Sequence, residues 1–220
     1  MKKYLGEYIG TFALVFCGTG AIVIDNATHG GVSHAGVAFT FGLIVMAMIY
    51  SFGETSGAHM NPAVTIAFAV AGKFDKMLVL PYIISQLAGA FTASLVLKLM
   101  FPTDEYLGAT IPAGSYMQSF MLEVILSWLL MTVILNVSQG SKETGIMAGL
   151  AIGSTILLEA MFAGPISGAS MNPARSLAPA VVSGNLSPVW IYLAAPITGT
   201  VIASLAWKLM NTMGKKKLGF

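Results

Sequence analysis

The chain has 220 residues, of which 56% are hydrophobic and only 9% are charged, with a formal net charge of +2. Because a typical soluble domain carries about 25% charged residues, this composition excludes a soluble globular enzyme. The chain has 11 basic and 9 acidic residues, so it lacks the excess of positive charge that is typical of nucleic-acid-binding proteins. Its single cysteine, Cys17, excludes a disulfide framework within the chain. The sequence has neither a Gly-x-Ser-x-Gly elbow nor a His-Glu-x-x-His helix, so we expect no enzyme activity, no metal and no cofactor.

Six apolar stretches are long enough to cross a membrane as helices. A helix needs about 20 apolar residues to span a hydrocarbon core of about 30 Å. In chain order, the predicted spans are residues 4–24, 35–53, 78–100, 117–137, 145–163 and 188–210. The first stretch follows Lys2 and Lys3 but has no convincing small-residue cleavage site, so we interpret it as a retained span and not as a signal peptide.

The basic residues predict how these spans are oriented. Six spans place both termini on one side of the membrane. Of the 11 basic residues, all but Lys98 and Arg175 would then lie on that side. Cytoplasmic loops carry an excess of lysine and arginine, so we expect both termini in the cytoplasm. The sequence thus predicts a multi-pass protein of the plasma membrane, with the lipid bilayer as its surroundings.

An internal repeat divides the chain into two halves. Residues 56–63 read Ser-Gly-Ala-His-Met-Asn-Pro-Ala, and residues 167–174 repeat them except that Ser170 replaces His59. Each half holds three spans, an odd number, so the second half enters the membrane from the opposite side. Such inverted repeats place a functional site at the repeat interface, near the membrane midplane. The prediction is one domain over residues 1–220, with repeats of roughly 1–100 and 117–213.

A shorter apolar stretch follows the second span of each half, at residues 61–71 and 172–182. About 11 residues give about 16 Å of helix, which is half a bilayer. Asparagine is a good N-cap and proline is favoured at the next position, so both stretches are predicted half-helices that begin at Asn61 and Asn172. The expected fold is an all-α membrane protein with six transmembrane helices and two re-entrant half-helices whose N-termini meet at the midplane.

The two Asn-Pro-Ala segments are typical of a pore for neutral polar molecules. Two helix N-termini at the midplane carry about half a positive charge each, which repels cations and protons. The asparagine amides can donate to a passing water, and extended backbone before them would present carbonyl acceptors. The predicted pore centre is Asn61, Pro62, Ala63, Asn172, Pro173 and Ala174, and the predicted pore-lining loop residues are Gly57, Ala58, His59, Gly168 and Ser170.

The chain resembles the aquaporin (major intrinsic protein) family, because it has two Asn-Pro-Ala segments and an arginine, Arg175, directly after the second. Residues 62–69 and 163–177 are most similar to the plant nodulin-type branch and its bacterial relatives. The resemblance implies a homotetramer with one pore in each subunit. It also implies that Glu7 and Glu123 are buried carboxylates that hold the re-entrant loops, since an intramembrane carboxylate needs a fixed partner.

The family's selectivity filter has four positions near the outer mouth, and these correspond to Phe41, Ala160, Ala169 and Arg175. Two alanines and one aromatic wall predict a wider and less polar aperture than a water-only filter. The expected function is a passive channel for water and small uncharged solutes such as glycerol, which excludes protons and ions. The alternatives are a strict water channel, and a metalloid or ammonia channel of the nodulin-type branch. An error of one residue in the assignment would place Glu159 in the pore.

Two further side chains keep open interpretations, and a third, Cys17, has one. Glu54 is either a plain interfacial residue or a group of the cytoplasmic vestibule. His59 either orients its loop or senses protons. Cys17 is interpreted as a small apolar helix residue, and the family's usual mercury-sensitive position corresponds to Ala169, so we expect resistance to mercurials by that route.

Overall fold

The computed structural model describes residues 1–138 and 146–217, and within them every regular element is a helix. The long helices are α1 (Lys2–Ala27), α2 (Ser33–Ser56), α4 (Val79–Met100), α5 (Tyr116–Val137), α7 (Ala148–Ser167) and α9 (Val189–Lys217). The short helices are α3 (Pro62–Val70), the 3-10 turn η1 (Lys76–Leu78) and α8 (Pro173–Ser183).

Six of these helices are long and apolar enough to cross a membrane, as the sequence predicts. Most extend a few residues beyond the predicted spans, because helices continue past the apolar core into polar residues at the interface. Helix α7, which corresponds to the fifth predicted span, continues to Ser167, beyond the predicted end of that span. The start of that span at Gly145 lies outside the described residues.

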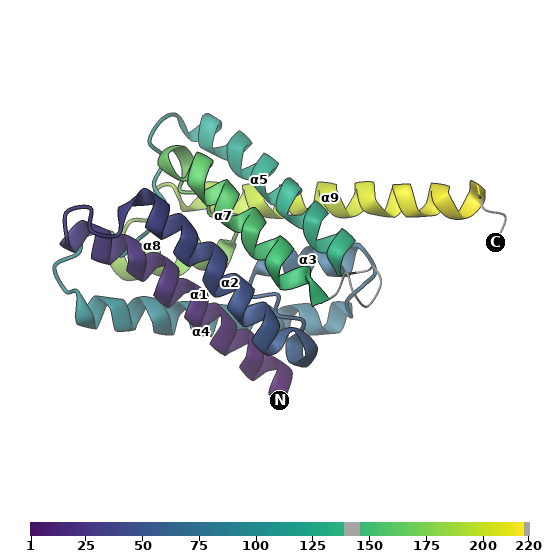
Figure 1. Ribbon diagram of the computed structural model, residues 1–220, viewed down its shortest axis with the longest axis horizontal. Helices are drawn as coiled ribbons and strands as arrows, with labels where there is room; N and C mark the ends of the chain where they lie inside the picture. The colour runs from purple at the N-terminus through teal and green to yellow at the C-terminus, as the bar shows by residue number, and fades with distance from the viewer. Residues whose placement is uncertain (139–145, 218–220) are drawn as a thin grey trace.

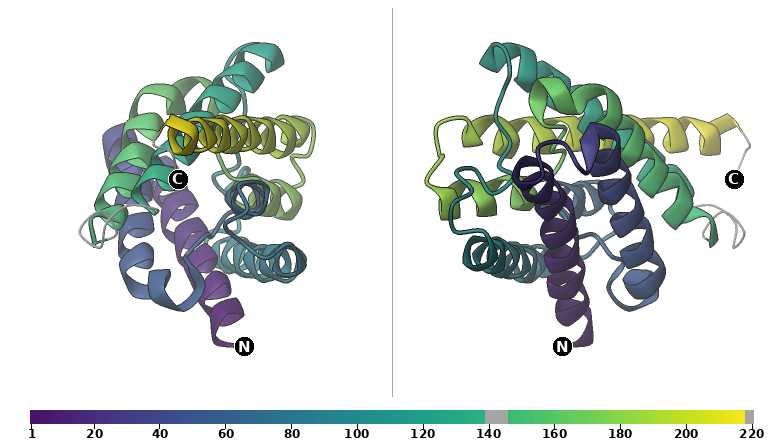
Figure 2. Two further views of the ribbon diagram at one scale, coloured as in Figure 1. Left: turned by 90° about the vertical axis from the view of Figure 1, so that its right-hand side faces the viewer. Right: turned by 60° about the vertical axis from the view of Figure 1, so that its left-hand side comes forward.

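The two halves of the chain pack against each other through several pairs of helices. The first three long helices pack through α1 with α2 and α4, and the last three pack through α5 with α7 and α9. The halves meet where α2 lies along α7 (Figure 1). The half-helices α3 and α8 each contact a long helix of the other half, since α3 packs on α9 and α8 packs on α4. Figure 2 shows α3 enclosed among the long helices.

Glycines allow the closest helix crossings at corresponding places of the two halves. A Cβ on Gly89 of α4 would overlap the carbonyl oxygen of Tyr8 in α1. A Cβ on Gly199 of α9 would likewise overlap the carbonyl oxygen of Val124 in α5. Small residues let membrane helices approach until their backbones touch.

Candidate functional site

The site begins at the two asparagines that cap the short helices. Asn61 has extended backbone, and its Oδ1 accepts from the N–H of Ala63 at 2.9 Å. Asn172 caps α8 in the same way, and its Oδ1 accepts from the N–H of Ala174 at 3.0 Å. A proline occupies the first turn of each short helix, where no N–H partner is needed. Both half-helices therefore begin where the sequence predicts.

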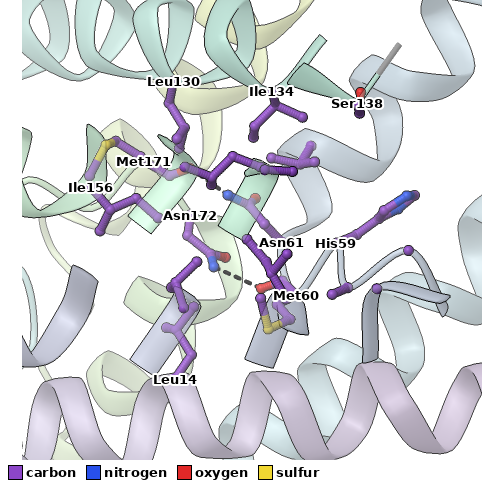
Figure 3. A pocket seen from close by; sticks show the side chains of 18 of the residues that line it. Leu14, His59, Met60, Asn61, Leu130, Ile134, Ser138, Ile156, Met171 and Asn172 are labelled. Carbon is purple, nitrogen blue, oxygen red and sulfur yellow. Dashed lines mark hydrogen bonds between the residues drawn. The ribbon is translucent and has the colours of Figure 1, made fainter. Parts of the chain in front are cut away.

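The two caps are cross-linked through their amide nitrogens. Asn61 Nδ2 donates to the carbonyl oxygen of Met171 at 2.8 Å, and Asn172 Nδ2 donates to the carbonyl oxygen of Met60 at 2.9 Å (Figure 3). Each loop thus binds the asparagine of the other half. A primary amide carries two N–H groups, so each asparagine keeps one further donor, and both asparagines line the cavity described below.

The loops before the caps differ from the extended segments expected from the sequence. In the first loop Gly57, Ala58 and Met60 have φ angles of 84°, 46° and 51°. In the second loop Gly168, Ala169 and Met171 have φ angles of 84°, 40° and 54°. The expectation of extended backbone is therefore wrong at these residues. In extended backbone successive N–H groups point to opposite sides, whereas left-handed residues let neighbouring N–H groups converge on one anion.

Glu7 of α1 is that anion for the first loop. It is fully buried, and its Oε1 accepts from the N–H of His59 at 2.9 Å. Its Oε2 accepts from the N–H of Met60 at 2.7 Å and from Nε2 of Gln86 at 2.7 Å. Three donors from two elements surround one buried carboxylate, so the loop's strained backbone is fixed by a charge-assisted set of bonds.

Glu123 of α5 occupies the corresponding place for the second loop and is also fully buried. Its Oε1 accepts from the N–H of Ser170 and from the hydroxyl of Ser167, both at 2.8 Å. Its Oε2 accepts from the N–H of Met171 at 2.8 Å. The structure therefore brings both predicted carboxylates to the loops that they are expected to hold.

The four predicted filter residues line the same cavity. Arg175 is only 2% exposed, and its Cζ lies 5.0 Å from the ring centroid of Phe41. Its Nη1 donates to the carbonyl oxygen of Gly108 at 2.7 Å. Its buried Nε has no partner among the described residues. The cavity is therefore lined by a guanidinium, an aromatic ring and two alanines, which combine a polar donor with apolar surface.

The cavity that these residues line has a volume of about 830 Å³. Side chains such as Leu14, Leu130, Ile134 and Ile156 surround the paired asparagines (Figure 3). In the described part of the chain, the acidic and basic residues that line the cavity are Glu54, Lys73 and Arg175. An apolar cavity with a few convergent polar groups is the usual form of a binding or conduction site.

The other predicted site residues divide into two groups. Four loop residues line the cavity, namely Gly57, Ala58, His59 and Ser170. Seven are not among its lining residues, namely Pro62, Ala63, Gly168, Pro173, Ala174, Glu7 and Glu123. In this second group, the prolines and alanines begin the two half-helices, and Gly168 caps the C-terminus of α7. The two glutamates bind the loops, so the group supports the residues that line the cavity.

His59 packs inside a group of aromatic rings. Its ring centroid lies 4.8 Å from those of Phe68 and Phe74 and 5.3 Å from that of Tyr82. Its Nδ1 lies 3.1 Å from Oγ1 of Thr65 in α3. These contacts favour the interpretation that His59 orients its loop.

Glu159 lies outside the cavity lining, next to Ala160 in α7. Its side chain is 3% exposed, and neither carboxyl oxygen has a hydrogen-bond partner among the described residues. Cys17 is half-buried in α1 and is likewise not among the lining residues.

Several residues that hold the site were not identified from the sequence. The Tyr82 hydroxyl donates to the carbonyl oxygen of Ser56 at 2.8 Å, and the Tyr192 hydroxyl donates to that of Ser167 at 2.6 Å. Ser176 Oγ lies 2.6 Å from Oγ of Ser170, which ties α8 back to its own loop. The recurrence of Tyr82 as Tyr192 is visible in the sequence as part of the internal repeat, but it does not indicate what the two hydroxyls bind.

Known proteins are similar to this chain in sequence. Residues 1–207 match the family described as Major intrinsic protein. The chain is 44% identical to a Zea mays protein described as Aquaporin NIP1-1, over 98% of this chain and 77% of that protein. It is 45% identical to an Arabidopsis thaliana protein described as Probable aquaporin NIP4-2, over 97% of this chain and 76% of that one.

A solved structure shares the fold as well. The X-ray structure of the aquaglyceroporin from Plasmodium falciparum matches with a TM-score of 0.85 and 27% sequence identity, over 94% of this chain and 95% of that chain. With the family match over most of the chain, the fold and the paired Asn-Pro-Ala segments lead to one conclusion. The chain belongs to the major intrinsic protein family, the aquaporins, and is a multi-pass membrane channel for water and small solutes.

Proposed function

We propose that this channel passes water and small uncharged solutes of the size of glycerol and excludes protons and ions. The observation that carries the proposal is the crossed pair of bonds, from Asn61 to Met171 and from Asn172 to Met60, inside the cavity where two half-helices begin. Fixed donors at the meeting of two positive helix ends suit a neutral molecule that accepts hydrogen bonds.

Proton exclusion follows from how a water would sit between the asparagines. The free N–H groups of Asn61 and Asn172 would occupy both lone pairs of one water oxygen. That water could then donate but not accept, so it could not relay a proton along the file. The positive ends of α3 and α8 oppose a hydronium ion at the same point.

The solute range rests on the outer part of the cavity. We propose that Phe41, Ala160, Ala169 and Arg175 form the selectivity filter. The Arg175 guanidinium would donate to a permeant hydroxyl and repel cations, while the Phe41 ring would contact a carbon chain. The two alanines leave the opposite wall open, which favours glycerol-like solutes over water alone. The name of the similar solved structure, an aquaglyceroporin, supports the same solute class.

A metalloid or ammonia channel is the second candidate. It is favoured by the similarity to plant proteins described as NIP-type aquaporins. A small neutral hydroxy acid or ammonia would meet the same donors and the same open wall.

The remaining features of the channel are also proposals. We infer one channel domain over residues 1–220 with two inverted repeats, and a homotetramer in the plasma membrane with both termini in the cytoplasm. The orientation is supported by the bias of lysines toward the terminal side. Assembly and lipid contact are supported by large exposed apolar side chains on several long helices, which include Leu43, Leu80, Leu95, Leu158 and Leu205.

Stopped-flow light scattering on proteoliposomes tests the proposal. A sucrose gradient measures water efflux, a glycerol gradient adds re-swelling, and a trapped pH-sensitive dye reports proton leak. We expect fast shrinkage and fast re-swelling with a proton leak no greater than that of empty liposomes. Flux should rise linearly with the gradient and need no coupling ion, whereas saturation or ion dependence would contradict a channel. Arsenite and ammonia gradients then test the second candidate.

A further inference from the structure

The two helices that carry the proposed filter positions Phe41 and Ala160, α2 and α7, pack closely at a pair of glycines. A Cβ on Gly42 would lie 2.6 Å from the carbonyl oxygen of Gly153, and a Cβ on Gly153 would lie 2.6 Å from that of Gly42. This contact sets the separation of the helices at one point. Their separation at the filter, toward the outer end, needs a further contact.

Pro165 leaves an unpaired carbonyl at that outer end. In an α-helix each carbonyl accepts from the N–H four residues later, and proline has no N–H. Pro165 lies inside α7, so the carbonyl oxygen of Met161 has no donor within its own helix. Met161 directly follows the filter residue Ala160.

His34 of α2 supplies the missing donor. Its Nε2 lies 2.7 Å from the carbonyl oxygen of Met161, and because a carbonyl only accepts, the ring nitrogen must donate. The ring has room because residue 164 is glycine. A Cβ on Gly164 would lie 2.9 Å from Cε1 of His34.

At the other end of α7, a backbone group without a helical partner is also bound by a side chain of α2. The N–H of Leu150 is in the first turn of α7, where no helical acceptor exists. It donates to the hydroxyl oxygen of Tyr50 at 3.2 Å. Two backbone groups of α7 that lack helical partners are therefore both bound by side chains of α2, one at each end of the glycine contact.

We propose that His34 is a positioning residue for the selectivity filter. By binding the carbonyl next to Ala160, it holds the α7 wall at a fixed distance from Phe41 and so limits the size of the solutes that pass. The inference rests on the proposed function. It assigns to a histidine outside the cavity lining a role in selectivity, separate from the residues that touch the permeant.

The test compares the permeability of erythritol, a four-carbon polyol, with that of water in proteoliposomes. In His34→Ala, the ratio should rise by about two- to tenfold, the range that corresponds to the loss of one hydrogen bond. His34→Gln should restore the wild-type ratio, because its amide nitrogen can donate from a similar position. His29→Asn, in the connection between α1 and α2 that precedes His34, is the matched control, and asparagine tolerates the φ of 54° found there.

Gly164→Ala gives a second route to the same state if His34→Ala fails to fold. Its methyl group should displace the His34 ring and raise the ratio as His34→Ala does. In the double variant, Gly164→Ala should add nothing, because the ring is already gone.

An unchanged ratio in His34→Ala, a glutamine variant that behaves like the alanine variant, or additive effects in the double variant would overturn the inference. These outcomes differ from failure of the proposed function, in which the wild-type protein itself would show no water or glycerol flux.

Discussion

At the scale of single residues, Arg175 is a buried cation whose guanidinium is held by two contacts. The carbonyl oxygen of Gly108 binds Nη1, and the ring of Phe41 lies 5.0 Å from Cζ. These contacts hold the guanidinium in place, and Arg175 lines the cavity. Arg175 could be predicted from its place after the second Asn-Pro-Ala segment. Gly108 could not, because it lies in an irregular connection far from Arg175 in the sequence.

Gly18 makes room for Phe41, the aromatic residue of the proposed filter. A Cβ at this position would overlap the ring of Phe41. We therefore expect Gly18→Ala to push the ring toward the cavity, lower water permeability severalfold and cost about 1–3 kcal/mol of stability. Stopped-flow shrinkage and thermal unfolding measure the two effects. Gly20→Ala is the matched control, since its Cβ would meet only the end of Leu97 at 3.3 Å. Equal permeability of both variants would contradict this account of Gly18.

Glu159 is a buried carboxyl group without a protein partner among the described residues. Burial of an unpaired polar group costs about 1–3 kcal/mol in proteins, so Glu159→Leu should raise the free energy of unfolding by a similar amount. Because Glu159 does not line the cavity, water and glycerol permeabilities should stay at wild-type values. Thermal unfolding and stopped-flow scattering check both expectations. A destabilised or altered channel would mean that Glu159 has a partner or a role in conduction.

At the scale of elements, each re-entrant segment consists of a loop, a cap and a half-helix held by one carboxylate. The half-helices could be predicted because asparagine, proline and an apolar run are local signals. The left-handed loop backbone could not, because it is imposed by Glu7 and Glu123 from other helices. Non-glycine residues such as Ala58 and Ala169 give no local sign of a positive φ.

The two carboxylates should be equivalent in their effect on the loops. In Glu123→Gln, one acceptor oxygen becomes a donor, so an N–H of Ser170 or Met171 loses its partner. This should cost about 1–3 kcal/mol and reduce water permeability, because the second loop also binds Asn61. Glu7→Gln should give the same two effects through the first loop and Asn172. Thermal unfolding and stopped-flow scattering of both variants compare the halves, and loss of function in only one would contradict their equivalence.

At the scale of the whole molecule, the inverted repeat produces a site to which both halves contribute. Each half-helix packs on a long helix of the other half, and each asparagine binds the other loop. The six spans and the meeting of the half-helices could be predicted from hydropathy and the repeated octet. The contact between α2 and α7 could not, because glycines and a freed carbonyl leave no periodic pattern in the sequence.

We propose that an open, alanine-lined filter lets glycerol pass together with water. The most direct test is the ratio of glycerol to water permeability, measured side by side in wild-type and Ala160→His proteoliposomes. We predict that the wild-type channel shrinks quickly in sucrose and re-swells quickly in glycerol, while Ala160→His still shrinks quickly but no longer re-swells. A wild-type channel that passes water without glycerol, or a histidine variant that passes both, would contradict the assignment of Ala160 to the filter.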